Sequence, residues 1–175
     1  MMLRTASFVL LISALFAQRP PTARIETSPP RSAHGQDSLA IVVNQSNPIN
    51  ELSLADLRTV FLGERSHWAN GRRITLVMME PGQPERDVIV REVCRMSEPD
   101  FRRRFLQGLL TGEVLVSPKT LATPVGVRKF VFNVPGAIGY LRPAEVDNTV
   151  KVLRIDGHLP GDAEYALRLP ERSEP

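Results

Sequence analysis

The stretch from Arg72 to Val93, RRITLVMMEPGQPERDVIVREV, has the residue pattern of an anion-binding loop. It runs from an apolar strand through a Gly-Pro loop into the first turns of a helix. The start of a helix presents backbone N–H groups without partners and a positive dipole end, so such a junction can hold a phosphate or a similar anion. Gly82, Gln83 and Arg86 are the residues of this loop that could donate hydrogen bonds to the anion.

The same loop carries features that oppose the binding of a dianion. Pro84 removes one N–H group from the helix start, and Glu80 and Glu85 bring negative charge to it. One like-charge contact at about 4 Å costs roughly 4 kcal/mol at an effective dielectric constant of about 20. In the alternative interpretation, Gln83, Pro84 and Glu85 only form a good helix start, and this interpretation is favoured.

Two other places along the chain could contribute polar groups to a ligand site. Asn44 and Ser46 follow the first predicted strand, at the end where α/β domains commonly bind ligands. Thr120 stands shortly before the fourth predicted helix. Asn and Ser ahead of Pro48 are also ordinary turn residues, so ligand binding and turn formation both stay open as roles for Asn44 and Ser46.

The sequence does not indicate an enzyme, a metalloprotein or a nucleic-acid-binding protein. The three histidines, His34, His67 and His158, show no metal-ligand spacing. Nucleophile-elbow, Walker-type and dinucleotide motifs are missing, and we expect no cofactor. Arginines are interspersed with acids, and aromatic residues make up 6% of the chain, so no basic surface with interleaved aromatics is predicted.

Hydrophobic patterning predicts one α/β domain between two polar segments. Short apolar runs of strand length alternate with amphipathic stretches of helix length, which is typical of a mainly parallel sheet flanked by helices. The third of these helices carries five apolar residues, Phe101, Phe105, Leu106, Leu109 and Leu110. The predicted strands are residues 38–44, 74–79, 135–141 and 150–155, and the predicted helix caps are Ser53, Gln83, Ser97 and Thr123.

The two ends of the chain differ in composition from the domain. Residues 1–17, MMLRTASFVLLISALFA, are interpreted as a secretory signal peptide cleaved after Ala17, with an uncleaved anchor as the alternative. Residues 18–37 form a Pro/Ser-rich tether, residues 38–155 the domain, and residues 156–175 a polar tail that we expect to be poorly ordered. We therefore expect a periplasmic or secreted protein with no stable membrane span once the signal is removed.

Cys94 is the sole cysteine, so the exported chain cannot form an internal disulfide. Its place in a helical apolar pattern predicts a small buried hydrophobic residue.

Three segments together resemble the solute-binding proteins of phosphate ABC uptake systems. They are LSLADLRTVFLGERSHW, the strand with its Gly loop, and KFVFNVPGAIGYL, and the resemblance as a whole covers residues 39–141. The family typically shows an IFLG…W segment, a strand running into an Arg-x-x-Gly-Ser-Gly-Thr loop, and a PGAIGY turn. Family members close two lobes on the ligand and are usually much longer than this chain. The resemblance thus implies a single lobe of a type II periplasmic-binding-protein fold.

The phosphate loop of that family is degenerate in this sequence. Laying Gly82 on the first Gly of the family loop puts Met79 at the position of its Arg, and Gln83, Pro84 and Glu85 replace Ser, Gly and Thr. The resemblance implies an exported, non-enzymatic, solute-binding-like module with a degenerate phosphate loop. Its expected partners are a small oxyanion such as phosphate and a membrane transporter or another periplasmic protein. The alternative is an accessory or protein-interaction module that keeps the fold but binds no small anion. Convergent donors at the strand ends would favour the first, and an exposed apolar patch the second.

Overall fold

The computed structural model of this chain describes residues 38–115 and 117–169. The signal peptide and the tether predicted over residues 1–37 lie outside the described residues, as do residues 170–175.

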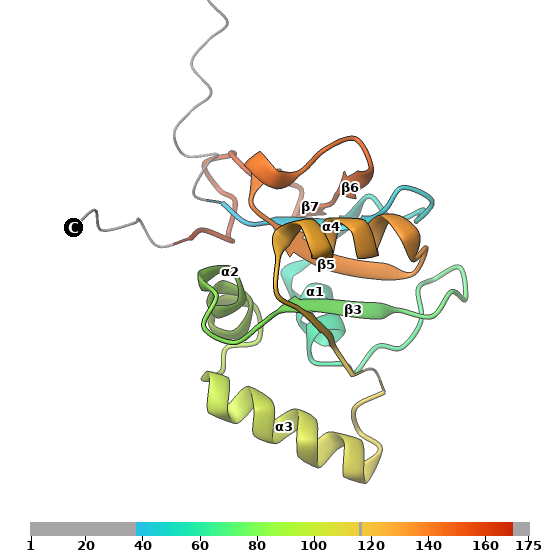
Figure 1. Cartoon of the computed structure of the whole chain (residues 1–175), viewed down its shortest axis with the longest axis vertical. Helices are drawn as coiled ribbons and strands as arrows, with labels where there is room; N and C mark the ends of the chain where they lie inside the picture. Colours follow the sequence, from blue (N-terminus) through green and yellow to red (C-terminus); the bar gives the residue numbers. More distant parts are fainter. Residues whose placement is uncertain (1–37, 116, 170–175) are drawn as a thin grey trace, which may run out of the picture. The chain divides into compact units, whose positions relative to one another are not determined.

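A five-stranded sheet forms the centre of the domain (Figure 1). Its order is β4-β3-β5-β1-β6, and β3 pairs in parallel with both β4 and β5. Strand β1 is antiparallel to both of its neighbours, β5 and β6, so four strands run one way and β1 runs the other. The predicted α/β fold with a mainly parallel sheet is confirmed. The strands are β1 (Ala40–Asn44), β3 (Thr75–Met79), β4 (Lys119–Leu121), β5 (Ala137–Leu141) and β6 (Val150–Val152).

The helices begin where the sequence predicted. The side chains of Ser53, Ser97 and Thr123 each accept a hydrogen bond from a backbone N–H in the first turn that follows. Gln83 occupies the corresponding position of α2 but makes no side-chain cap bond. The helices are α1 (Leu54–Phe61), α2 (Pro84–Val88), the π-helix η2 (Ile89–Val93) that continues α2, α3 (Glu98–Thr111), α4 (Pro124–Asn133) and the 3-10 helix η3 (Pro143–Glu145).

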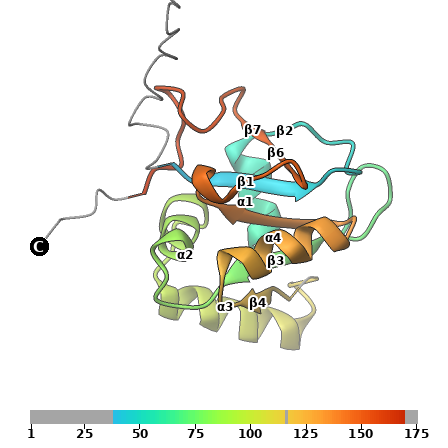
Figure 2. The same ribbon diagram turned by 45° about the horizontal axis from the view of Figure 1, so that its top comes forward.

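Helices pack on both faces of the sheet, and two successive residues of β5 each contact a helix on a different face. A Cβ atom added at Gly139 would meet side chains of Val127 and Val131, so α4 lies close against this face. The next residue, Tyr140, points to the opposite face, because side chains alternate along a strand. Its ring centroid lies 6.0 Å from that of Phe61 in α1. Figures 1 and 2 show α4 and α1 on these two sides of the sheet.

The folded unit extends past the predicted boundary at residue 155. The side chains of Tyr165, Leu167 and Leu169 are buried, and the hydroxyl of Tyr165 donates to the carbonyl of Leu39 at 2.7 Å. The backbone N–H of Leu39 donates to the carbonyl of Leu167 at 2.9 Å. The expectation of a poorly ordered polar tail is therefore wrong for residues 156–169, where apolar side chains at alternate positions enter the core.

The last predicted strand is divided between two sheets. Residues of β6 pair with β1, whereas β7 (Arg154–Ile155) pairs in parallel with the short strand β2 (Glu51–Leu52). Between them, the buried Leu153 donates its N–H to the carbonyl of Ile41 at 2.9 Å. Over residues 38–115 and 117–169, no helix combines the length and apolarity that crossing a membrane requires.

Candidate functional site

The carboxyl ends of the three parallel strands β3, β4 and β5 define the edge at which this type of sheet binds ligands. The Gly82 loop follows β3 at this edge. Thr120 of β4 is in register with Met78, and Leu121 is in register with Met79. The N–H of Glu80 donates to the carbonyl of Leu121 at 3.2 Å. Gly82, Gln83 and Thr120 therefore lie at the same edge of the sheet.

Asn44 and Ser46 lie at the opposite edge. Because β1 is antiparallel to β5, the end of β1 lies beside the start of β5. In register terms, Val43 pairs with Ile138, which in turn pairs with Leu76 near the start of β3. From the sequence we expect the end of β1 at the ligand-binding edge. The structure instead separates Asn44 and Ser46 from the Gly82 loop by the length of the sheet.

The hydrogen bonds of Asn44 are those of a structural residue. Its side-chain amide donates to the carbonyls of Val131 and Phe132 at 2.9 and 2.6 Å, and both residues belong to the last turn of α4. Its Oδ1 accepts the N–H of Ser46 at 2.9 Å, and the hydroxyl of Ser46 accepts a bond from Arg72 at 3.0 Å. Of the two roles open for Asn44, these contacts favour the structural one over ligand binding. Its polar groups bond to the end of α4 and to the turn that follows β1.

The guanidinium of Arg86 is directed into the protein and away from the open side of the loop. Its Nε and Nη2 donate to the two carboxylate oxygens of Glu98 at 3.0 and 2.9 Å, and Nη1 donates to the carbonyl of Met79 at 2.8 Å. The centroid of the Phe101 ring lies 5.6 Å from Cζ of Arg86. The side chain of Arg86 is 5% exposed, so this arginine ties α2 to α3 and to the end of β3.

Glu85 is likewise buried and paired. Its carboxylate accepts a hydrogen bond from Nε of Arg142, the residue that follows β5 at the same edge. The sequence reasoning missed Arg142, although its position directly after the apolar run of β5 marks a strand end where ligand-binding residues gather. The sequence reasoning also missed Glu98, the partner of Arg86. Arg86 lies in α2 and Glu98 begins α3, and no local pattern predicts that these two helix starts pack together.

The electrostatic balance around the loop is negative. Glu85 and Glu98 are neutralised by Arg142 and Arg86, whereas Glu80 and Asp87 make no ion pair within the described residues. Gly82 itself is exposed with φ of 89°, and no atom lies within 4 Å of the place where a Cβ would stand. The loop is therefore open to solvent, but its charges do not converge on a site for a dianion.

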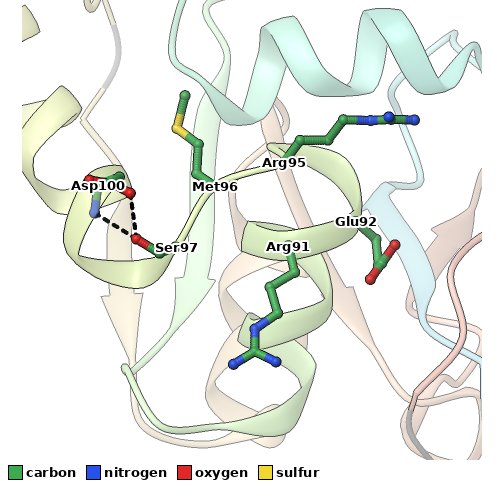
Figure 3. A pocket seen from close by; sticks show the side chains of 6 residues that line it. All are labelled: Arg91, Glu92, Arg95, Met96, Ser97 and Asp100. Atoms are coloured by element: carbon green, nitrogen blue, oxygen red, sulfur yellow. Dashed lines mark hydrogen bonds between the residues drawn. The ribbon is translucent and has the colours of Figure 1, made fainter.

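A separate hollow lies between η2 and the start of α3 (Figure 3). Figure 3 shows Arg91 and Arg95 pointing in different directions, so their guanidinium groups do not share a target. Ser97 and Asp100 are engaged with each other in the cap of α3. Glu92 and Met96 complete the lining, so this hollow does not present a set of converging donors. Within the described part of the chain, no three His, Cys, Asp or Glu side chains gather in a way that could hold a metal ion.

None of the protein-family models that were compared matches this sequence. In three dimensions, the chain is similar to a Clostridium perfringens protein described as a phosphate ABC transporter substrate-binding protein with bound phosphate (TM-score 0.59, 21% identity). It is also similar to an ABC-type phosphate transport receptor from Vibrio cholerae (TM-score 0.58, 21% identity) and to PstS from Borrelia burgdorferi (TM-score 0.56, 14% identity).

The similarity covers 71% of this chain and 47%, 48% and 49% of those three structures. The chain thus spans about half the length of the structures it matches. At these identities the likeness establishes the fold, which is that of one lobe of the periplasmic-binding-protein fold. The architecture implied by the sequence resemblance is confirmed.

Proposed function

We propose that this chain is an exported, non-enzymatic protein that keeps one solute-binding-like lobe and acts through contacts with other proteins. In this proposal the Gly82 loop no longer holds phosphate. The main support for the proposal is the buried pair of Arg86 with Glu98. Because both carboxylate oxygens of Glu98 bind this guanidinium, Arg86 of α2 does not point to the open side of the Gly82 loop.

Energetics favour the internal pair over a bound anion. Removing one partner from a buried ion pair typically costs about 3–5 kcal/mol, because the other charge is left without compensation. A ligand that binds with a dissociation constant of about 1 mM supplies only about 4 kcal/mol in total. Phosphate that drew Arg86 out of its pair would therefore gain little, and the unpaired Glu80 and Asp87 would weaken it further.

Apolar surface on α3 supports a role in protein contact. Leu106, Leu109 and Leu110 are among the exposed large hydrophobic residues of the described chain. A membrane transporter or another periplasmic protein is the class of partner that an exported lobe of this fold would meet. We further propose that residues 1–17 act as the export signal and residues 18–37 as the tether, which gives a periplasmic or secreted protein.

A small oxyanion such as phosphate as ligand is the second candidate function. It is favoured by the open Gly82 loop and by the similarity to a structure that contains phosphate. Gly82, Gln83 and Thr120 would then contribute donors from one edge of the sheet. Arg142, which follows β5 at this edge, would supply a cation in place of Arg86 by leaving its pair with Glu85.

Isothermal titration of the full chain with phosphate at low salt distinguishes the two candidates. We expect no saturable heat up to millimolar phosphate. Two variants that each add one negative charge serve as a matched pair. Gln83→Glu alters the loop, whereas Asn70→Asp lies in the turn before β3 and keeps the oxygen that accepts the N–H of Arg72. Saturable heat that Gln83→Glu abolishes and Asn70→Asp preserves would establish the second candidate instead.

A further inference from the structure

Helix α3 buries one side and presents leucines on the other. Phe101 and Phe105 are buried against the domain, whereas Leu106, Leu109 and Leu110 are 64%, 50% and 82% exposed. At 100° per residue these three leucines fall on one side of the helix. Figures 1 and 2 show α3 at the lower end of the domain, with one long side turned away from the other elements. Such a continuous apolar stripe is typical of a helix that pairs with another helix.

Opposite charges stand at the two ends of this leucine stripe. Arg102 and Arg103 precede the leucines, and their side chains are both 65% exposed. Arg102 contacts Glu98 at 3.9 Å and Arg103 contacts Asp100 at 3.3 Å. Ion pairs at the surface contribute little free energy, so both arginines can also pair with a partner. Glu113 follows the helix, is exposed, and makes no ion pair within the described residues.

The order of these groups makes the stripe complementary to itself. Consider two copies of α3 that lie antiparallel with their leucines together, about an axis at the height of Gly108 along the helix. Leu106 of one copy then faces Leu110 of the other. Glu113 stands just past the C-terminal cap Gly112, so the antiparallel arrangement also brings Arg103 of one copy to the helix end at which Glu113 of the other copy stands. The last turn of α3 carries no basic residue, and the antiparallel arrangement brings the arginines of the second copy toward this negative helix end.

We propose that α3 is the contact surface between two copies of this chain, related by a two-fold axis. The inference rests on the proposed function in protein contact and names the partner as a second copy. A two-fold contact uses the same patch on both subunits, so self-complementarity is the property it requires. One helix on each side is a small interface, and we expect a reversible dimer that forms in the micromolar range.

Sedimentation equilibrium of the full chain, expressed with its own N-terminal segment, tests this proposal at concentrations up to about 200 µM. We expect a monomer–dimer equilibrium. Leu110→Glu should raise the dissociation constant at least tenfold, because each dimer then buries two uncompensated charges among leucines. Phe132→Glu is the matched control: Phe132 is 53% exposed on α4, and its replacement should leave the dissociation constant unchanged.

A charge reversal tests the register of the two helices. Arg103→Glu should raise the dissociation constant several-fold, since the symmetric dimer contains the pair twice. The double variant with Arg103→Glu and Glu113→Arg should restore it, because the pair is rebuilt with the charges exchanged.

A wild-type chain that stays monomeric overturns the inference, and so does a dimer that responds to Phe132→Glu but not to Leu110→Glu. Failure of the reversal to restore the dimer overturns the antiparallel register. None of these outcomes changes the phosphate titration, so the inference and the proposed function fail separately.

Discussion

Arg86 and Glu98 are joined by two parallel hydrogen bonds, from Nε to Oε2 at 3.0 Å and from Nη2 to Oε1 at 2.9 Å. Such a bidentate pair between a guanidinium and a carboxylate is stronger and more specific in geometry than a single neutral hydrogen bond. It connects the first turn of α2 to the first residue of α3, and a third bond from Nη1 reaches the carbonyl of Met79 at the end of β3. The residue that the sequence offers as an anion ligand thus fixes three elements of the fold.

Replacing Arg86 should therefore reduce stability. We expect Arg86→Ala to lower the free energy of unfolding by about 3 kcal/mol, the low end for a buried pair because Glu98 keeps some solvent contact. Urea unfolding followed by the fluorescence of Trp68, the sole tryptophan, measures this change. Arg103→Ala, which breaks an exposed pair, should cost about 0.5 kcal/mol or less. Equal effects of the two variants would contradict the structural role of Arg86.

Gly136 is required by a close approach between two loops. A Cβ atom at this position would lie 2.0 Å from the carbonyl oxygen of Arg73. The carbonyl of Gly136 also accepts hydrogen bonds from Nε1 of Trp68 and from the N–H of Thr75, each at 3.0 Å. Gly136→Ala must shift the backbone here, and we expect it to lower the free energy of unfolding by about 3 kcal/mol.

The fluorescence of Trp68 provides a second readout for this substitution. Native Gly136→Ala should emit at longer wavelength than the wild type, because the displaced backbone opens the surroundings of the indole. Gly71→Ala is the control, since Gly71 has φ of 77° but no atom within 4 Å of its added Cβ. It should cost about 1 kcal/mol through backbone strain alone and leave the native emission unchanged. An unshifted emission of Gly136→Ala would mean that the two loops can separate without disturbing Trp68.

Local signals in the sequence were sufficient to locate the helices. The caps at Ser53, Ser97 and Thr123 bind backbone N–H groups within three residues, so their chemistry is contained in a short stretch of chain. The resemblance of separate segments to one family gave the fold. Trp68, the last residue of the first of these segments, is buried.

Relationships between distant segments could not be predicted in the same way. The direction of β1 depends on pairing with β5 nearly a hundred residues later, and that direction decides at which edge Asn44 lies. The partner of Glu85 is Arg142, 57 residues later in the chain, and the pairing of β3 with β5 brings the two together. Residues 156–169 have turn-rich composition, and their burial depends on three alternating apolar side chains that a compositional reading overlooks.

Stability should fall at alkaline pH because three buried acids are neutral in the fold. Burial raises the pKa of the Cys94 thiol from 9.0 to about 12 and raises the pKa of Tyr140 and Tyr165 well above 10. In the unfolded chain these groups lose their protons at lower pH. Their contribution to stability is therefore complete below pH 9 and is lost as the pH rises toward the folded values. Lys151, whose pKa is lowered by desolvation at a partly exposed position, acts in the opposite sense.

Urea unfolding at pH 7.5, 9 and 10.5 measures this dependence. For each group the free energy of unfolding should decrease by about 1.4 kcal/mol per pH unit between its unfolded and folded pKa. Cys94 begins to contribute near pH 9 and the tyrosines near pH 10, so Cys94→Ala should remove the earliest part of the decrease while keeping the later part. This comparison uses the slope with pH, which is independent of any constant loss of stability from the smaller side chain. A free energy of unfolding that is equal at pH 7.5 and 10.5 would show that these side chains reach solvent in the folded protein.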